Sequence, residues 1–312
     1  MRPAIVVLGS LNMDFVVRVA HLPAAGETVL GHSFVTLPGG KGANQACAAG
    51  RAGSTNVTVK MLGRVGYDVF GDQLKASLAA AGVDVSGVQA TQEQPTGVAL
   101  IWVDAQGQNS IVVASGANHA VRLDDVPAMR ATFRGAAFAL FQLETPLLAV
   151  GGALIMAREE GVKTILDPAP AQPLSDPILS QVDILTPNES EALTLLGRPP
   201  QRVAVEDAPA LAAALLKLGP AAVILKLGDR GCFYSDGQTA LHQQAFKVPA
   251  VDTTAAGDTF NGALAVALAQ NPDIKQALRF ASAAAALSVT RVGAQASIPE
   301  LSEIEYFTSR TT

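Results

Sequence analysis

The stretch VDTTAAGDTFNGAL, residues 251–264, gathers two carboxylates and several small residues in front of a helical pattern. From Phe260 onward, apolar residues recur at helical spacing, which predicts a helix over residues 257–270. The three residues at its N-terminus are small: Ala255, Ala256 and Gly257. Backbone N–H groups lack partners at a helix N-terminus, and the helix dipole attracts anions there. The turn therefore predicts an anion hole that a phosphoryl group can approach closely.

Asp258 falls in the first turn of the same predicted helix. Phosphoryl transfer needs donors for the developing negative charge and a base for the attacking hydroxyl, and this turn would supply both. The alternative is that Asp258 only caps the helix and complements its dipole.

A glycine-rich segment, GGKGAN at residues 39–44, opens an Ala-rich segment that we predict as a helix over residues 43–52. It lacks the spacing of a P-loop. Gly40 and Gly42 permit close approach of the backbone to a ligand, and Lys41 and Asn44 add donors that suit hydroxyl groups. The alternative is an ordinary glycine-rich turn.

Polar side chains also follow several predicted strands. Asn12 and Asp14 in GSLNMD, Glu144 in QLETP, and Asn188 and Glu191 in TPNESEA come directly after apolar runs. Open α/β sheets bind ligands beyond the carboxyl ends of their strands, so we expect these residues at one edge. Solvated residues at strand ends are the alternative. The segment KLGDRG, residues 226–231, suits nucleotide phosphates or a plain turn.

The elements that must position these residues alternate along the chain. Apolar runs predict strands at 4–10, 56–63, 136–143, 163–168, 182–188 and 221–228, with further β-rich sequence after residue 229. Helical spacing predicts helices at 43–52, 70–82, 146–160, 189–196 and 207–218, and two closing helices at 257–270 and 274–289. Several strands lack alternation, as in a sheet buried on both faces. We therefore predict an α/β fold with a doubly wound, mostly parallel sheet in a single domain, residues 1–312.

Two inserted segments, residues 14–40 and 96–115, break this alternation with strand-like runs and turn residues. We predict that they form one small sheet that stands off the core as a lid. The alternative is that they are edge strands of the main sheet.

Composition excludes several classes of protein. Hydrophobic residues make up 49% of the 312 residues and the net charge is −5, which argues for a globular protein that does not bind nucleic acid. No apolar run reaches the roughly 18 residues of a membrane span. Two cysteines are too few for a disulfide framework, and four scattered histidines argue against a zinc site. We expect a cytoplasmic protein without a membrane partner.

Taken together and in order, the motifs resemble the ribokinase (PfkB) family of carbohydrate kinases over essentially the whole chain. The motifs that carry the resemblance are GSLNMD, PGGKGANQA, TGVALI, GAN, DPAPA, LTPNESEA, LGDRG, VDTTAAGDTFNGAL and TRVGAQAS. The segment DTTAAGDTF is close to the C-terminal signature of the family, which is very specific.

The resemblance implies a role for each matching position. Asp258 would be the general base, and Ala255, Ala256 and Gly257 the anion hole. The sugar would be held by Asn12, Asp14, Gly40, Lys41, Gly42, Asn44 and Glu144. The nucleotide would contact Asn188, Lys226, Leu227, Gly228, Asp229, Arg230, Gly231, Gly257, Asp258 and Ser282, with Asn188 and Glu191 in the motif linked to magnesium and phosphate. A monovalent cation would lie among Asp252, Thr254, Ser288, Arg291, Gly293 and Ser297, several of them through backbone carbonyls. Ser282 departs from the family pattern, which commonly has a longer polar residue such as His beside the adenine.

The resemblance implies an ATP-dependent kinase that converts D-ribose to D-ribose 5-phosphate, with Mg²⁺ as cofactor, K⁺ as activator and a homodimer formed through the lid sheet. Another small sugar or a nucleoside as acceptor, such as deoxyribose or fructose among the sugars, remains an alternative. A catalytically silent sugar-binding protein of the same fold is a second alternative, against which the retention of Asp258 argues. A dinucleotide-dependent dehydrogenase would need G-x-G-x-x-G where GSLNMD stands.

Overall fold

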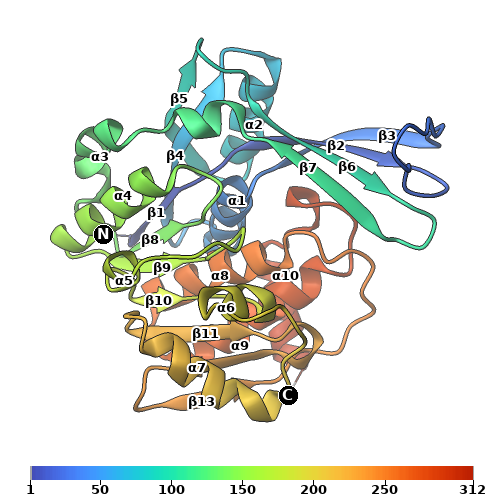
Figure 1. Ribbon diagram of the computed structural model, residues 1–312. Coiled ribbons are helices and arrows are strands. Elements are labelled where there is room, and N and C mark those ends of the chain that lie inside the picture. Colours follow the sequence, from blue (N-terminus) through green and yellow to red (C-terminus); the bar gives the residue numbers. More distant parts are fainter. Residues whose placement is uncertain (1, 312) are drawn as a thin grey trace.

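The main sheet of the molecule is doubly wound and mostly parallel, as predicted (Figure 1). The structure, a computed structural model, describes residues 2–311. Within this part, nine strands pair in the order β13-β12-β11-β10-β9-β8-β1-β4-β5. They are β1 (Ala4–Leu8), β4 (Thr58–Gly66), β5 (Val83–Thr91), β8 (Phe138–Phe141), β9 (Lys163–Leu166), β10 (Ile184–Leu185), β11 (Ala222–Lys226), β12 (Cys232–Ser235) and β13 (Ala240–Gln243). The pairs β11–β12 and β12–β13 are antiparallel, and the others are parallel.

Helices cover both faces of this sheet. The helices are α1 (Lys41–Gly53), α2 (Val69–Ala80), α3 (Val126–Phe133), α4 (Leu147–Glu159), α5 (Asp176–Leu179), α6 (Glu189–Leu195), α7 (Ala208–Leu216), α8 (Ala256–Gln270), α9 (Ile274–Ser288) and α10 (Leu301–Arg310). The sequence of β1 does not alternate between apolar and polar residues because both faces of the strand are buried. Ile5 and Val7 join the core under α1 and α8, whereas Val6 and Leu8 join the core under α4 and α7. Burying both faces of an apolar strand stabilises this layered arrangement.

Four elements were missing from the predicted pattern, and the shortest of them is α5, with four residues. Strand β5 lies at the edge of the sheet, pairs only with β4 and carries Gly87 near its middle, so it shows neither clear alternation nor a continuous apolar run. Helix α3 is short, with eight residues. The two helices predicted at 257–270 and 274–289 are present as α8 and α9, but α10, which was not predicted, follows them and buries Ile304 against the core as its one fully covered apolar side chain.

The two inserted segments form a sheet of their own, and the alternative of edge strands was wrong. Within residues 2–311, this four-stranded sheet has the order β3-β2-β6-β7. Its strands are β2 (Asn12–Arg18), β3 (Ser33–Gly39), β6 (Gly97–Val103) and β7 (Asn109–Ala114). Figure 1 shows it projecting from the core. The first strand begins at Asn12, slightly before the predicted segment.

Within residues 2–311, no helix combines the length and the apolar composition needed to span a membrane.

Candidate active site

The segment that follows β1, residues 9–12, packs directly against the glycine-rich segment at 39–42. A Cβ on Gly42 would lie 2.6 Å from backbone atoms of Gly9, and a Cβ on Gly40 would lie 2.7 Å from the backbone nitrogen of Asn12. Gly40 also has φ of 90°, which favours glycine. The glycine-rich segment thus begins α1 directly against the start of β2, and this contact brings the sugar-binding candidates together.

The polar residues around these turns are held by one another. Glu144 accepts hydrogen bonds from the Ser10 hydroxyl and, at 3.1 Å, from the backbone N–H of Lys41. Asn118, in the predicted motif GAN, donates to Asn12 Oδ1 at 2.7 Å. Ser10 and Asn118 were not predicted as site residues, although both lie in quoted motifs.

Asn44 links this group to the proposed base. Its Nδ2 donates to Asp258 Oδ2 at 3.0 Å. Its Oδ1 is buried and has no hydrogen-bond partner within residues 2–311. A buried oxygen without a partner is costly unless a ligand supplies a donor, so Asn44 Oδ1 is available to accept a hydrogen bond from a bound hydroxyl.

The carboxylates here are strongly perturbed. Burial, together with the nearby charges of Glu144 and Asp258, raises the pKa of Asp14 to about 7. Burial also raises the pKa of Asp258 to about 6, while Lys41 opposes this shift. Burial would lower the pKa of Lys41, yet the pKa is raised because surrounding carboxylates outweigh the effect, with Asp258 the largest. The site therefore holds a cation among acids whose charge changes near neutral pH.

Helix α8 begins in the predicted place and its N-terminus is open. Its first turn lines a pocket, and within residues 2–311 no side chain caps it. Ala255, the residue before the helix, has φ of 59°, a left-handed conformation that costs a non-glycine residue about 1–2 kcal/mol. The residues of this turn line the pocket, and the first N–H groups of a helix have no partner within the helix.

The pocket has a volume of about 680 Å³ and joins the proposed base to the predicted nucleotide residues. Residues that line it include Lys41, Asp167, Asn188, Glu191, Arg202, Lys226, Gly228, Thr253, Ala255, Ala256, Gly257 and Asp258. The predicted segments 188–191 and 226–228 thus meet the α8 turn. Arg202, which was not predicted, also lines the pocket and pairs with Asp229 at 3.2 Å.

Not every predicted nucleotide residue directs its side chain to this pocket. Arg230 pairs with Glu189 at 2.8 Å and donates to the carbonyl of Val203. The Ser282 hydroxyl lies 4.0 Å from the sulfur of Cys232. These two side chains therefore contact protein groups.

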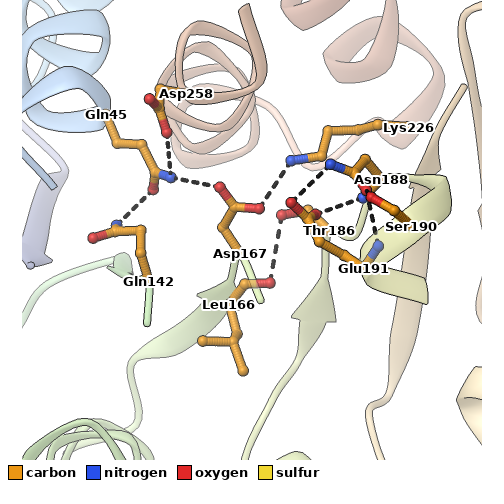
Figure 2. A network of polar contacts seen from close by, with 10 residues as sticks. All are labelled: Gln45, Gln142, Leu166, Asp167, Thr186, Asn188, Ser190, Glu191, Lys226 and Asp258. Atoms are coloured by element: carbon orange, nitrogen blue, oxygen red, sulfur yellow. Dashed lines mark hydrogen bonds and ion pairs between the residues drawn. The ribbon is translucent and has the colours of Figure 1, made fainter. Parts of the chain in front are cut away.

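Asn188 and Glu191 form a reciprocal cap at the start of α6 (Figure 2). Asn188 Oδ1 accepts from the Glu191 N–H at 2.9 Å, and the Glu191 carboxylate accepts from the backbone and side chain of Asn188, both at 2.7 Å. Burial raises the pKa of Glu191. The pair presents oxygen atoms at the pocket wall, and its part in holding magnesium remains a prediction.

A buried chain of polar side chains links the two halves of the site (Figure 2). Gln45 donates to both Asp258 and Asp167, and Asp167 pairs with Lys226 at 2.9 Å. Gln45 and Asp167 were missed as site residues. Asp167 follows β9 and could have been found by the rule that selected Glu144, whereas nothing local marks Gln45.

The two predicted cation segments also meet. Asp252 accepts hydrogen bonds from the backbone N–H of Thr254 at 2.9 Å and from that of Gly293 at 2.8 Å. The hydroxyls of Ser288 and Ser297 bond to backbone carbonyls of their own turns, and Arg291 pairs with Glu303. Across residues 2–311, no group of three or more His, Cys, Asp or Glu side chains could hold a metal. A cation here would depend on backbone oxygens.

Comparison with known proteins agrees with this geometry. The model of the pfkB family carbohydrate kinases matches residues 2–301. Ribokinase of Haemophilus influenzae is 42% identical over 304 residues, which cover 97% of each chain. Ribokinase of Schizosaccharomyces pombe is 43% identical over 307 residues, which cover 96% of each chain. A structure of Arabidopsis thaliana ribokinase complexed with ribose and ATP superposes with a TM-score of 0.90 at 34% identity and covers 100% of both chains. The chain therefore belongs to the pfkB family of carbohydrate kinases, as its motifs predict.

Proposed function

We propose that the protein is an ATP-dependent ribokinase, which transfers the γ-phosphoryl group of ATP to the 5-hydroxyl of D-ribose. The observation that carries this proposal is the position of Asp258, a buried carboxylate at the open N-terminus of α8 in a pocket shared with the candidate phosphate residues. The ribokinases among its relatives, similar over nearly their whole length, support ribose as the acceptor. The complex of the Arabidopsis enzyme with ribose and ATP supports both substrates.

Asp258 acts as the general base. With its pKa raised to about 6, the carboxylate is mostly ionised at pH 7 and still basic enough to accept the proton of a hydroxyl under attack. The N–H groups of the turn formed by Ala255, Ala256 and Gly257 bind the phosphoryl oxygens as charge develops. Asp14, Lys41, Asn44 and Glu144 orient the sugar, and the Oδ1 atom of Asn44 accepts a hydrogen bond from one of the sugar hydroxyls.

The donor set at the start of α6 fits magnesium. Asn188, Ser190 and Glu191 offer oxygen atoms to the pocket, and Mg²⁺ prefers oxygen ligands while it keeps several waters. When bound with ATP, Mg²⁺ neutralises charge on the phosphates. The chain's own Lys226 lies beside the anion hole, since a Cβ on Gly257 would lie 3.3 Å from its Nζ.

A coupled assay of ADP release over a panel of acceptors tests the proposal. Ribose should give the highest kcat/KM, followed by 2-deoxyribose, with fructose and nucleosides far lower. A different best acceptor would replace ribose within the same class. If calorimetry shows that ribose binds but no acceptor gives ADP release, the protein is a sugar-binding protein and the assignment as a kinase fails.

Potassium activates the enzyme through the Asp252 turn. Asp252 ties together the segments 252–254 and 288–297, and a large monovalent ion suits a cage of backbone oxygens there better than Mg²⁺ does. The ion would fix the turn that aims the N–H groups of α8. Initial rates at constant ionic strength should fall when tetramethylammonium replaces potassium. In Asp252→Ala, the rates in the two salts should be nearly equal, while some basal activity remains. Equal rates of the unaltered enzyme in the two salts would overturn this prediction.

The separate sheet closes over the sugar as a lid. Asp14 on β2 belongs to this sheet and also to the sugar site, so bound sugar should hold the sheet in place and exclude water. Hydrogen exchange in the segments 14–40 and 96–115 should slow when ribose is added. Protection confined to the main sheet would contradict a lid.

A second copy of the chain covers the lid sheet. Strand register puts Val35, Ile111 and Val113 on the face that carries Asp14, and all three side chains are exposed. Exposed apolar patches of this kind mark protein interfaces. Sedimentation should give twice the mass of one chain, and Ile111→Asp should give the single mass. The matched variant Ile155→Asp, at an exposed isoleucine of α4, should remain dimeric. A single mass for the unaltered protein would rule out the dimer.

The protein works in the cytoplasm, where ATP is available. Cys47 and Cys232 are buried and not joined in a disulfide, which fits a reducing compartment. Fractionation of cells that express the chain, with activity measured in each fraction, tests this assignment.

A further inference from the structure

Gln45 occupies a position that the roles above do not explain. It lies on α1 with none of its surface exposed. Its Nε2 donates to Asp258 Oδ1 at 3.1 Å and to Asp167 Oδ2 at 3.0 Å, and its Oε1 accepts from Gln142 Nε2 at 2.7 Å (Figure 2). One amide group therefore bridges the proposed base and a second buried carboxylate.

The surroundings of Gln45 fix the direction of its amide. Two carboxylates face one end, and only the NH₂ group can donate to both; the reverse orientation would direct its oxygen at two negative charges. Gln142 enforces the same direction, because it donates to the oxygen at the other end. Gln142 itself is wedged against Gly9, where a Cβ would lie 2.0 Å from Gln142 Oε1. No rotation of the amide satisfies the group equally well.

The bridge has an electrostatic consequence for Asp258. Charged groups from many elements act on the site: Lys41 on α1, Asp14 on β2, Glu144 after β8, Asp167 after β9, Glu191 on α6 and Lys226 at the end of β11. Among these, Asp167 raises the pKa of Asp258, whereas the hydrogen bonds from Asn44 and Gln45 lower it. Both carboxylates accept a hydrogen bond from the same Gln45 nitrogen, and these bonds offset the repulsion between the two negative charges.

We propose that Gln45 is a positioning residue for the reaction: its NH₂ group, shared with Asp167, holds the Asp258 carboxylate in the orientation and the ionised form in which it accepts the proton of the sugar hydroxyl. The inference rests on the proposed function, since it assigns Asp258 as the base. Asn44 holds the other oxygen of Asp258, so the two amides together leave the carboxylate one fixed rotamer. Gln142 acts one step further away, through Gln45.

Gln45→Met tests this role because methionine has a similar length and no donor. We expect kcat at pH 7 to fall about ten- to hundredfold, the range for a hydrogen bond to a charged group. The acid limb of the kcat profile should move up by about one pH unit, so that part of the rate returns between pH 7 and pH 9. The KM for ATP should change little. Gln142→Met should move the limb in the same direction by less.

Gln270→Met is the matched control, at an exposed glutamine at the end of α8, and should match the unaltered enzyme. A merely structural Gln45 would lower the melting temperature without moving the acid limb, and an unmoved limb in folded Gln45→Met overturns the proposal. If Gln45→Met does not fold, Gln142→Met decides by the same criterion. Failure of the unaltered enzyme to phosphorylate any sugar would instead reject the proposed function.

Discussion

Asp258→Asn is expected to lower kcat about 10²–10⁴-fold, the usual contribution of a general base. The substituted amide has the same shape but cannot accept the proton of the sugar hydroxyl. Ribose and ATP should still bind, because the N–H groups of α8 and the sugar-binding side chains remain. The rate is measured by ADP release at saturating ribose and MgATP, and binding by calorimetry. Turnover near that of the unaltered enzyme would reject Asp258 as the base. Asp72→Asn, at an exposed aspartate of α2, is the matched control.

The same substitution should change how stability depends on pH. The pKa of Asp258 is raised from 3.8 to about 6 in the folded chain, so ionising it opposes folding as pH rises between these values. A shift of two units corresponds to roughly 3 kcal/mol at full effect. Denaturant unfolding should therefore show Asp258→Asn gaining stability relative to the unaltered chain between pH 4 and pH 7. A difference that is constant with pH would show that Asp258 is not perturbed.

Features that depend on neighbours in sequence were predictable. The open N-terminus of α8 follows from a few consecutive residues and the helical pattern behind them. The parallel sheet follows from apolar runs such as Ile5 to Leu8, which must bury both faces. These predictions use local spacing only, and the structure confirms them.

Features that depend on contacts between distant segments were not predictable. Gln45 and Asp258 are 213 positions apart, and Gln45 and Asp167 are 122 apart. No local pattern distinguishes Gln45 from a glutamine on a solvent-exposed helix face, because its role arises only when α1 packs on α8. Strand β5 was missed for a related reason, since an edge strand with a central glycine depends on β4 rather than on its own sequence.

The arrangement also explains how one small region serves two substrates. Lys41 lines the pocket proposed for the phosphates, while its backbone N–H donates to Glu144, which is proposed to hold the sugar. Asp258 similarly bonds to Asn44 and lines the same pocket. The proposed base therefore lies between the proposed sugar site and the pocket proposed for the phosphates, as direct transfer between two bound substrates requires.

Asp14→Ala should weaken the binding of ribose by about 1.5–3 kcal/mol, the range for hydrogen bonds to a charged group. The Asp14 carboxyl is buried in the proposed sugar site, so its loss should leave ring hydroxyls without a partner. The affinity for ATP without sugar should barely change, because Asp14 lies on β2 and does not line the phosphate pocket. Calorimetry with each substrate measures both effects.

The pH dependence of ribose binding gives Asp14 a signature of its own. Its pKa is raised to about 7, so the carboxyl is largely protonated below that pH and ionised above it. If ribose hydroxyls donate to the ionised form, the affinity for ribose in the unaltered enzyme rises through pH 7, and this rise disappears in Asp14→Ala. In Asp14→Ala, the change in ribose affinity that comes from ionisation of Asp258 should remain near pH 6, where the pKa of Asp258 lies. An equal loss of ATP affinity in Asp14→Ala, or an unchanged rise through pH 7, would mean that Asp14 supports the fold and does not contact the sugar.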